Sequence, residues 1–293
     1  MSNNLKRIVF ALWAIPAALG IVYLGGLPLA LLVAAISALG AHELVGIARR
    51  QGIEPLWRHT LILSALIPLG VWLAYGGTVV RLGGLDWSSM LPSVWFALAG
   101  TVIWVLAATL FRRAPDQHPL GVASVTIMAP LYCAVLPSFL LGIRYATGPD
   151  RSWPATWAVF FPLAVTWICD SVAMWVGKSV GGPKLAPVVS PGKTRSGSAA
   201  GFIGGIAAAV LFNRIAMIPS GFTVTDLQAV VFGAVLSVAA QVGDLAESLF
   251  KREVGVKDSS GLIPGHGGIL DRFDALYFVV PISAMLYRAF GLL

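Results

Sequence analysis

The chain has 293 residues, of which 57% are hydrophobic and only 11% are charged, and its formal net charge is +7. Soluble domains carry about 25% charged residues, so this composition excludes an ordinary soluble protein and indicates that most of the surface faces lipid. The two cysteines, Cys133 and Cys169, lie in separate apolar segments. They predict buried reduced thiols rather than a disulfide framework or a thiolate metal site.

The hydrophobic runs predict an all-α integral membrane protein. A bilayer core about 30 Å thick needs roughly 20 apolar residues per helix. Applied along the chain, this length predicts about nine spans, near residues 8–24, 27–46, 59–76, 90–111, 119–142, 155–177, 198–219, 227–250 and 273–292. Proline removes a backbone donor, so Pro130 and Pro137 predict that the fifth span is kinked or broken. No signal-peptide cleavage site follows Lys6 and Arg7, so we expect the first helix to be retained.

The loop charges predict the orientation of these spans. With the N-terminus in the cytoplasm, fifteen of the 20 Lys and Arg residues fall on the cytoplasmic side and five on the other. This asymmetry predicts a cytoplasmic N-terminus and an outside C-terminus. Positive charge spread along membrane-proximal loops favours anionic headgroups, so we expect membrane lipids and no nucleic acid as partners. We expect residues 1–293 to form a single polytopic membrane domain, with N-terminal helices in 1–150 and catalytic helices and cytoplasmic loops in 155–293.

Carboxylates inside the predicted spans are functional candidates, because placing a charge in lipid is costly. Asp170 lies well inside the 155–177 span, and Asp244 and Glu247 lie in the 227–250 span. Spacings of three or four residues place on one helix face a polar stripe made of Gln241, Asp244, Ser248 and Lys251. A helix-packing stripe explains glutamine and serine well but explains a carboxylate poorly. We therefore favour a functional role for Asp244 and for Asp170.

A polar segment continues from this stripe to the start of the last predicted helix. It contains three cations, a glycine-rich turn, and two aspartates beside an arginine, and its candidate residues are Lys251, Arg252, Lys257, Asp258, His266, Gly267, Gly268, Asp271, Arg272 and Asp274. Glycine amides and helix starts can approach an anion closely, and Lys and Arg neutralise phosphate oxygens. Aspartates without His or Cys partners suit Mg²⁺. The segment therefore predicts transfer at a phosphorus centre.

A second basic loop, rich in Gly and Pro, lies between the sixth and seventh predicted spans. Its candidate phosphate-binding residues are Lys184, Ser190, Lys193 and Thr194. Gly192-Lys193-Thr194 lacks the upstream glycine of a Walker motif, and no strand is predicted to lead into it. Its expected cytoplasmic side and its proximity to Asp170 still favour phosphate binding over a merely basic loop. We expect this loop and Asp170 to form the other wall of the site.

The C-terminal residues resemble the signature of the phosphatidate cytidylyltransferases, also called CDP-diacylglycerol synthases. The matching residues are Ser248, Lys251, Arg252, Lys257, Asp258, Pro264, His266, Gly267, Gly268, Asp271, Arg272 and Asp274. The family's Ser-Pro-Lys-Lys-Thr-x-Glu-Gly loop matches Ser190, Pro191, Lys193, Thr194 and Gly197. Three positions depart from the family pattern: Gly192 stands for a lysine, Ser196 for the glutamate, and Ser260 where glycine is common.

This resemblance implies the reaction of CTP with phosphatidic acid to give CDP-diacylglycerol and pyrophosphate. It implies Mg²⁺, with K⁺ in some members, and it carries the metal-binding role over to Asp244 and Asp271. On this hypothesis Lys251, Arg252, Lys257 and Arg272 hold the charge of the leaving pyrophosphate. His266 either donates a hydrogen bond or a proton, or simply shapes the turn. The resemblance also implies a homodimer, and the compact chain is typical of an enzyme of the bacterial inner membrane with its active site facing the cytoplasm.

Three other functions fit parts of this pattern less well. A CTP-dependent polyprenol kinase shares the membrane setting but transfers the γ-phosphate, so it releases CDP in place of pyrophosphate. A transporter explains buried charges but predicts paired broken helices in two related halves, whereas the candidate residues here cluster in the C-terminal half. A CDP-alcohol phosphotransferase is disfavoured because its Asp-rich helix pattern is missing.

Overall fold

The computed structural model describes the backbone of residues 3–76, 87–263 and 267–293 and is mostly helical. The helices are α1 (Asn3–Leu24), α2 (Gly26–Arg49), α3 (Trp57–Gly76), α5 (Trp87–Leu110), α6 (Pro119–Pro130), α7 (Leu136–Ala146), α8 (Trp153–Val180), α9 (Arg195–Phe212), α10 (Ile218–Ser220), α11 (Asp226–Glu253), α12 (Leu270–Phe273) and α13 (Leu276–Ala289). Short 3-10 or π segments occupy Pro115–Gln117, Leu131–Val135 and Asn213–Met217. Two strands, β1 (Lys184–Ala186) and β2 (Ser190–Thr194), form an antiparallel hairpin where the sequence predicts only a loop.

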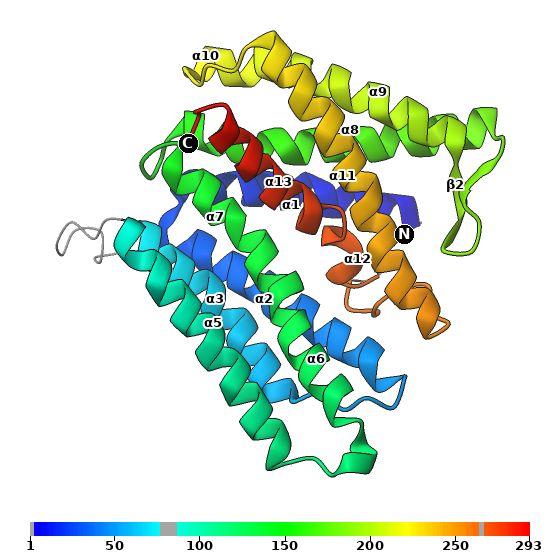
Figure 1. Cartoon of the computed structure of the whole chain (residues 1–293). Helices are drawn as coiled ribbons and strands as arrows, with labels where there is room; N and C mark the ends of the chain where they lie inside the picture. Colours follow the sequence, from blue (N-terminus) through cyan, green and yellow to red (C-terminus); the bar gives the residue numbers. More distant parts are fainter. Residues whose placement is uncertain (1–2, 77–86, 264–266) are drawn as a thin grey trace. The chain divides into compact units, whose positions relative to one another are not determined.

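The chain divides into two compact units, which we describe separately. One unit is Gly26–Leu141, and the other combines Met1–Gly25 with Gly142–Leu293. In the Gly26–Leu141 unit, α2, α3, α5 and α6 run along one another as a helical bundle (Figure 1). The α2–α3 connection is fastened to α6 by Leu56, whose backbone N–H donates to Thr126 Oγ1 at 3.0 Å.

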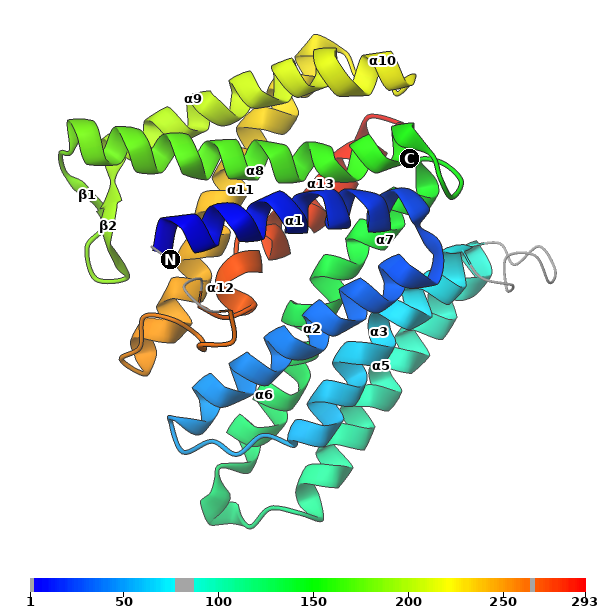
Figure 2. The same cartoon turned by 180° about the vertical axis from the view of Figure 1, so that it is seen from behind.

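The second unit is built on the close pairing of α8 with α9, which lie side by side in both views and are crossed by α11 (Figures 1 and 2). Small residues allow this approach, as is usual between helices in membranes. A side chain at Gly201 of α9 would place its Cβ 2.9 Å from the Cys169 carbonyl oxygen and 2.8 Å from the Ala173 Cβ on α8. The last long helix, α13, packs along α11 and completes the unit, and the short α12 precedes it.

Among the described residues, six helical segments are long and apolar enough to cross a bilayer. They are Gly26–Arg49, Trp57–Tyr75, Pro119–Ala146, Trp153–Val180, Arg195–Ser220 and Asp226–Glu253. Two further predicted spans coincide with α1 and α5, whose described apolar parts are Ala14–Leu24 and Trp95–Leu110. The last predicted span, 273–292, contains the 14-residue α13. The polytopic helical character is thus confirmed, and the number of nine spans and their orientation stay predictions.

The break predicted in the fifth span is confirmed. Pro130 ends α6, a five-residue π segment spans Leu131–Val135, and α7 then continues with Pro137 near its start. A π turn absorbs the missing proline donor without ending the helical path. The 28-residue segment Pro119–Ala146 therefore remains one candidate span.

Arg144 ties the start of the second unit to α8, although its side chain is fully buried. Its Nε donates to the Val22 carbonyl at 2.8 Å and its Nη2 to the Tyr23 carbonyl at 3.1 Å, both at the end of α1. Its Nη1 donates to Gly148 and Pro149 carbonyls in the α7–α8 connection at 3.2 and 2.9 Å. The guanidinium thus satisfies carbonyls that α1, as a helix ending inside the protein, would otherwise leave without donors.

Replacing Arg144 with Met should lower the stability of the protein by about 3 kcal/mol, because several buried carbonyls would lose a charged donor. The measurement is the unfolding midpoint of purified protein in detergent. Arg288→Met, at an exposed arginine on α13, is the matched control and should change the midpoint little. Equal midpoints for the two variants would show that the hydrogen bonds of Arg144 do not stabilise the protein.

Candidate active site

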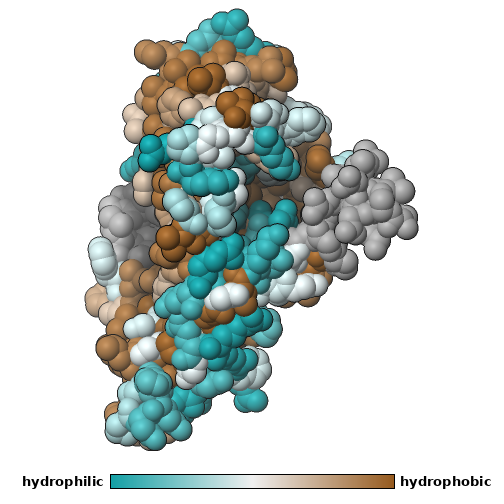
Figure 3. Space-filling model, turned by 90° about the vertical axis from the view of Figure 1, so that its right-hand side faces the viewer, coloured by the Kyte–Doolittle hydropathy of each residue, from teal (hydrophilic) through white to brown (hydrophobic). Residues whose placement is uncertain are grey.

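A cavity of about 670 Å³ opens in the second unit among α8, the hairpin, α11 and α12. Its volume is within the range of small-molecule sites. Thirteen predicted site residues line it: Asp170, Ser190, Lys193, Thr194, Asp244, Ser248, Lys251, Arg252, Lys257, Asp258, Asp271, Arg272 and Asp274. Viewed from the side on which the hairpin lies, hydrophilic residues gather in a band between hydrophobic surfaces (Figure 3). The structure therefore brings the two predicted phosphate-binding segments to one polar cavity.

The hairpin forms one wall of the cavity, and its Lys193 reaches α11. The Lys193 Nζ lies 2.7 Å from Asp244 Oδ2. Thr194 fixes the end of β2 by capping α9, since its Oγ1 accepts from the Gly197 N–H at 3.1 Å. Gly197 in turn packs against Gly177 of α8. A Cβ added at Gly197 would lie only 3.0 Å from the Gly177 Cα. These small residues explain how a basic loop comes to face the acidic stripe on α11.

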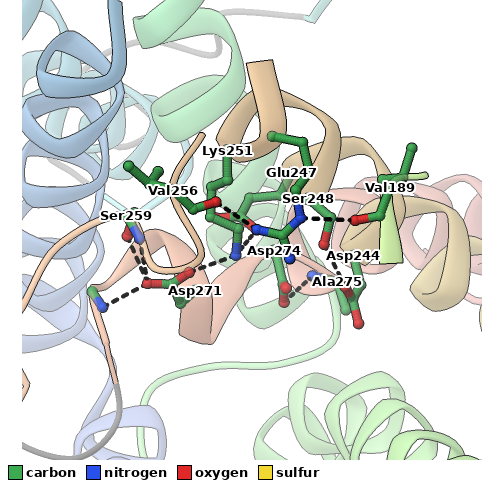
Figure 4. A network of polar contacts seen from close by, with 12 residues as sticks. Val189, Asp244, Glu247, Ser248, Lys251, Val256, Ser259, Asp271, Asp274 and Ala275 are labelled. Atoms are coloured by element: carbon green, nitrogen blue, oxygen red, sulfur yellow. Dashed lines mark hydrogen bonds and ion pairs between the residues drawn. The ribbon is translucent and has the colours of Figure 1, made fainter. Parts of the chain in front are cut away.

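Asp271, at the start of α12, is the centre of a second polar network (Figure 4). Its Oδ1 lies 2.6 Å from Lys251 Nζ. Its Oδ2 accepts three hydrogen bonds of 2.8 Å, from the backbone N–H and Oγ of Ser259 and from the N–H of Gly268. Burial by itself would raise the pKa of the Asp271 carboxyl, but the hydrogen bonds from Lys251, Gly268 and Ser259 outweigh it and hold the pKa below its ordinary value.

The glycine-rich turn is shaped around Asp271. Gly267 has φ +78°, and a Cβ at this position would lie 2.7 Å from Asp271 Oδ2. Its carbonyl accepts from the Ile263 N–H at 2.8 Å, which closes the turn. Only glycine meets both requirements at low cost. His266, predicted as catalytic, and Pro264 of the signature lie outside the described residues.

Lys251 is nearly buried and is shared between two carboxylates. Besides Asp271, its Nζ pairs with Glu247 one helical turn earlier on α11. The carboxylate of Glu247 is fully buried and does not line the cavity. Its partner Lys251 does line the cavity. From the sequence, Glu247 was placed inside a span and no role was predicted for it. Its i, i+4 spacing to Lys251 could have predicted the ion pair.

Arg252 connects the hairpin to the segment that follows α11. Its Nε donates to the Val189 carbonyl in the hairpin turn at 3.1 Å, and its Nη1 donates to the Val256 carbonyl. The sequence predicts that Arg252 holds phosphate charge. In the structure, the guanidinium already donates to two backbone carbonyls. It thereby holds together two walls of the cavity, the hairpin and the segment after α11.

Three aspartates give the cavity an acidic side. Asp170 on α8, Asp244 on α11 and Asp274 after α12 all line it. Gly243 permits this arrangement, because a Cβ there would lie 2.9 Å from the Asp274 carbonyl oxygen. Among the described residues, no three His, Cys, Asp or Glu side chains are arranged to hold a metal ion by themselves. Carboxylate oxygens are nevertheless the donor type that Mg²⁺ prefers, so the chemistry of this lining fits such a cation.

Three predicted substrate-binding residues do not line the cavity. Lys184 is exposed on β1 opposite Thr194. Gly267 packs against the Asp271 carboxylate, and the Gly268 N–H donates to it. In exchange, the cavity has an apolar flank on α8 that the sequence reasoning missed, with Trp167 and Met174 43% and 50% exposed and Lys178 beyond them. Their spacing of three to four residues around Asp170 was the available signal.

Comparison with known proteins agrees with this geometry. Residues 5–290 match the sequence model of the Cytidylyltransferase family. The chain belongs to this family. The match spans almost the whole chain, so the N-terminal helices belong to the family's pattern as much as the cavity does.

Several relatives in the family carry the name phosphatidate cytidylyltransferase. The protein of that name from Bacillus subtilis is 30% identical over 99% of this chain and 100% of its own length. Phosphatidate cytidylyltransferase 5 of Arabidopsis thaliana, a chloroplast protein, is 32% identical over 98% of this chain and 72% of its own. The relative from Brucella abortus is 44% identical over 44% of this chain and 45% of its own.

Substituting Arg252 with Gln should loosen the hairpin turn, because the Val189 carbonyl loses its charged donor. Losing a hydrogen bond worth about 1.4 kcal/mol corresponds to roughly tenfold faster local opening. Hydrogen–deuterium exchange of the backbone amides in the paired strands β1 and β2 measures this change. Arg195→Gln, at an exposed arginine just beyond β2, is the control. Unchanged exchange in Arg252→Gln would show that the guanidinium does not hold the turn.

The lowered pKa of Asp271 predicts how its contribution to stability depends on pH. The contribution is fully present above the ordinary carboxyl pKa of about 4 and is lost as the pH falls through the lowered folded-state value. Asp271→Asn should therefore be less stable than wild type at about pH 7 and should lose less additional stability on acidification. Unfolding midpoints across this pH range test it, with exposed Asp116→Asn as the control. Parallel pH profiles for wild type and Asp271→Asn would refute the assignment.

Proposed function

We propose that this chain is a membrane-embedded phosphatidate cytidylyltransferase. It transfers CMP from CTP to phosphatidic acid and gives CDP-diacylglycerol and pyrophosphate. The observation that carries the proposal is one cavity lined by cations from the hairpin and α11 and by carboxylates from α8, α11 and α12, in a chain that matches the cytidylyltransferase family from residue 5 to 290.

The cations around the cavity bind the phosphates of both substrates. Lys257 and Arg272 line the cavity and are exposed, so their charges are available to phosphate oxygens. Lys193 adds a third cation from the hairpin side. Arg252 orients the hairpin on which Lys193 stands. This division of labour supports binding of the nucleotide phosphates between the hairpin and the loop after α11.

Asp244 and Asp271 are proposed to hold Mg²⁺, with K⁺ as a second cation of the site. The metal ion would neutralise phosphate charge and orient the reacting oxygens. In the present arrangement Asp244 is paired with Lys193 and Asp271 with Lys251. Both carboxylates therefore face a cation already, and the lysines keep them oriented toward the cavity. Asp170 and Asp274 supply further oxygen atoms on the same side.

The reaction needs positioning more than acid–base chemistry. An oxygen of the phosphatidate phosphate attacks the α-phosphorus of CTP, the bond from that phosphorus to the bridging oxygen breaks, and pyrophosphate leaves with the electron pair. A phosphate monoester is already a competent nucleophile near neutral pH, so the site requires no strong base. Lys257 and Arg272 stabilise the charge that develops on the leaving group.

The membrane setting provides the lipid substrate. Asp170 and Asp244 belong to two of the candidate spans, so the cavity begins within the bilayer, and Trp167 and Met174 give it an apolar flank. We propose nine spans with the N-terminus in the cytoplasm, the cavity facing the cytoplasm, and the bacterial inner membrane as the location. A homodimer and the absence of a nucleic-acid partner are part of the same proposal.

The test is an assay of purified protein with labelled CTP and phosphatidic acid. We expect CDP-diacylglycerol and pyrophosphate, whereas release of CDP would indicate a lipid kinase. Asp244→Asn should lower the rate by about a hundredfold or more, the size of effect known for one preorganised electrostatic contact. Asp226→Asn, at an exposed aspartate at the other end of α11, is the matched control. Wild-type rates in Asp244→Asn would contradict the mechanism.

A further inference from the structure

Glu247 is a charged residue that substrate contact does not explain. Its side chain has no exposed surface and is absent from the cavity lining, although Asp244, Ser248 and Lys251 on the same helix all line the cavity. A buried carboxylate is costly unless a cation or donors compensate it. In the described part of the chain, the ammonium of Lys251 forms an ion pair with Oε2 of Glu247.

Lys251 divides its charge between two acids. Its Nζ contacts Glu247 on one side and lies 2.6 Å from Asp271 Oδ1 on the other. With both carboxyl groups ionised, Glu247, Lys251 and Asp271 together carry one net negative charge in a nearly buried place, with side-chain exposures of 0%, 9% and 4%. The group therefore lacks one positive charge. Of its two carboxylates, Asp271 is the one that lines the cavity, so an additional cation can reach it from there.

We propose that Glu247 is a positioning residue, which holds Lys251 back from Asp271 so that Asp271 can accept a divalent cation. The inference rests on the proposed function, in which Asp271 is a ligand of Mg²⁺. When a cation binds Asp271, the ammonium of Lys251 is repelled and moves wholly to Glu247, which keeps it paired inside the protein. Before the divalent cation binds, the ammonium of Lys251 occupies its place at Asp271. After binding, that ammonium is paired with Glu247.

This arrangement predicts opposite effects for two substitutions. In Glu247→Gln, Lys251 has Asp271 as its one remaining carboxylate, so the cation must displace a stronger ion pair. Divalent cation binding should weaken by roughly tenfold, the lower end of the range for residues that support metal ligands. In the double variant Glu247→Gln/Lys251→Met, the competing ammonium is gone, and the Asp271 carboxylate keeps its hydrogen bonds from Ser259 and Gly268. Cation binding should then recover to at least the wild-type affinity.

The experiment titrates Mn²⁺ into purified full-length protein in detergent and follows the free Mn²⁺ signal by electron paramagnetic resonance, without substrates. The matched control is Glu253→Gln, the same substitution at an exposed position on the same helix, which should bind Mn²⁺ like wild type. Unfolding midpoints of every variant accompany the titrations. A merely structural role for Glu247 would make the double variant bind at least as poorly as the single one.

Each outcome decides the proposal. Weakened binding in Glu247→Gln with recovery in the double variant supports it, and wild-type affinity in a folded Glu247→Gln protein overturns it. If Glu247→Gln does not fold, the double variant decides alone, and affinity below wild type overturns the proposal. Wild-type protein that makes CDP-diacylglycerol but binds no Mn²⁺ refutes this inference and leaves the activity standing. Wild-type protein that binds Mn²⁺ but makes no CDP-diacylglycerol refutes the proposed function instead.

Discussion

The polar cavity of this protein depends on one buried carboxylate, that of Asp271, whose negative charge must be balanced by hydrogen bonds and an ion pair. Four hydrogen bonds or ion pairs converge on its two oxygens, from α11, from the loop after α11 and from the glycine turn. A segment of irregular backbone beside a membrane-spanning helix needs partners for its polar groups. Asp271 supplies them from the centre of that segment, so the loop that carries Lys257 and Asp258 is arranged around the same side chain that faces the cavity.

The hairpin is joined to this centre through α11. Lys193 reaches Asp244, while Arg252 holds the hairpin turn by the Val189 carbonyl and the following loop by Val256. One side-chain contact and one backbone clamp therefore couple two segments separated by more than fifty residues in sequence. This coupling gives a cavity with cations on two walls, which a single phosphate-binding loop could not provide for a nucleotide triphosphate and a lipid phosphate together.

Much of this site could be predicted from the sequence, because its chemistry is unusual for the chain. In a protein with so few charges, Asp244 and Asp170 stand out against the apolar spans, and the spacing from Ser248 to Asp274 fixes the family resemblance. Pro130 likewise announced the irregular turn between α6 and α7. These signals are local, and local signals are the ones that a single sequence carries.

The remaining features depend on long-range packing. The acceptors of Arg252 are backbone carbonyls, which have no side-chain identity to read, and the same holds for the carbonyls bound by Arg144. The grouping of α1 with residues 142–293 also leaves no mark in the N-terminal sequence. Lys184 and Lys193 are equally basic, and only the register of the hairpin shows that Lys193 reaches Asp244 while Lys184 stays exposed.

The two lysine–aspartate pairs differ in a way that matters for the chemistry. Lys193 and Asp244 are 27% and 30% exposed, whereas Lys251 and Asp271 are 9% and 4% exposed. A solvated pair holds little net free energy and opens readily, while breaking a buried pair leaves an uncompensated charge. The Lys193 pair can therefore exchange with phosphates and cations at small cost. The Lys251 pair can exchange only if another buried carboxylate takes the ammonium, and the place of Glu247 one turn below Lys251 meets that requirement.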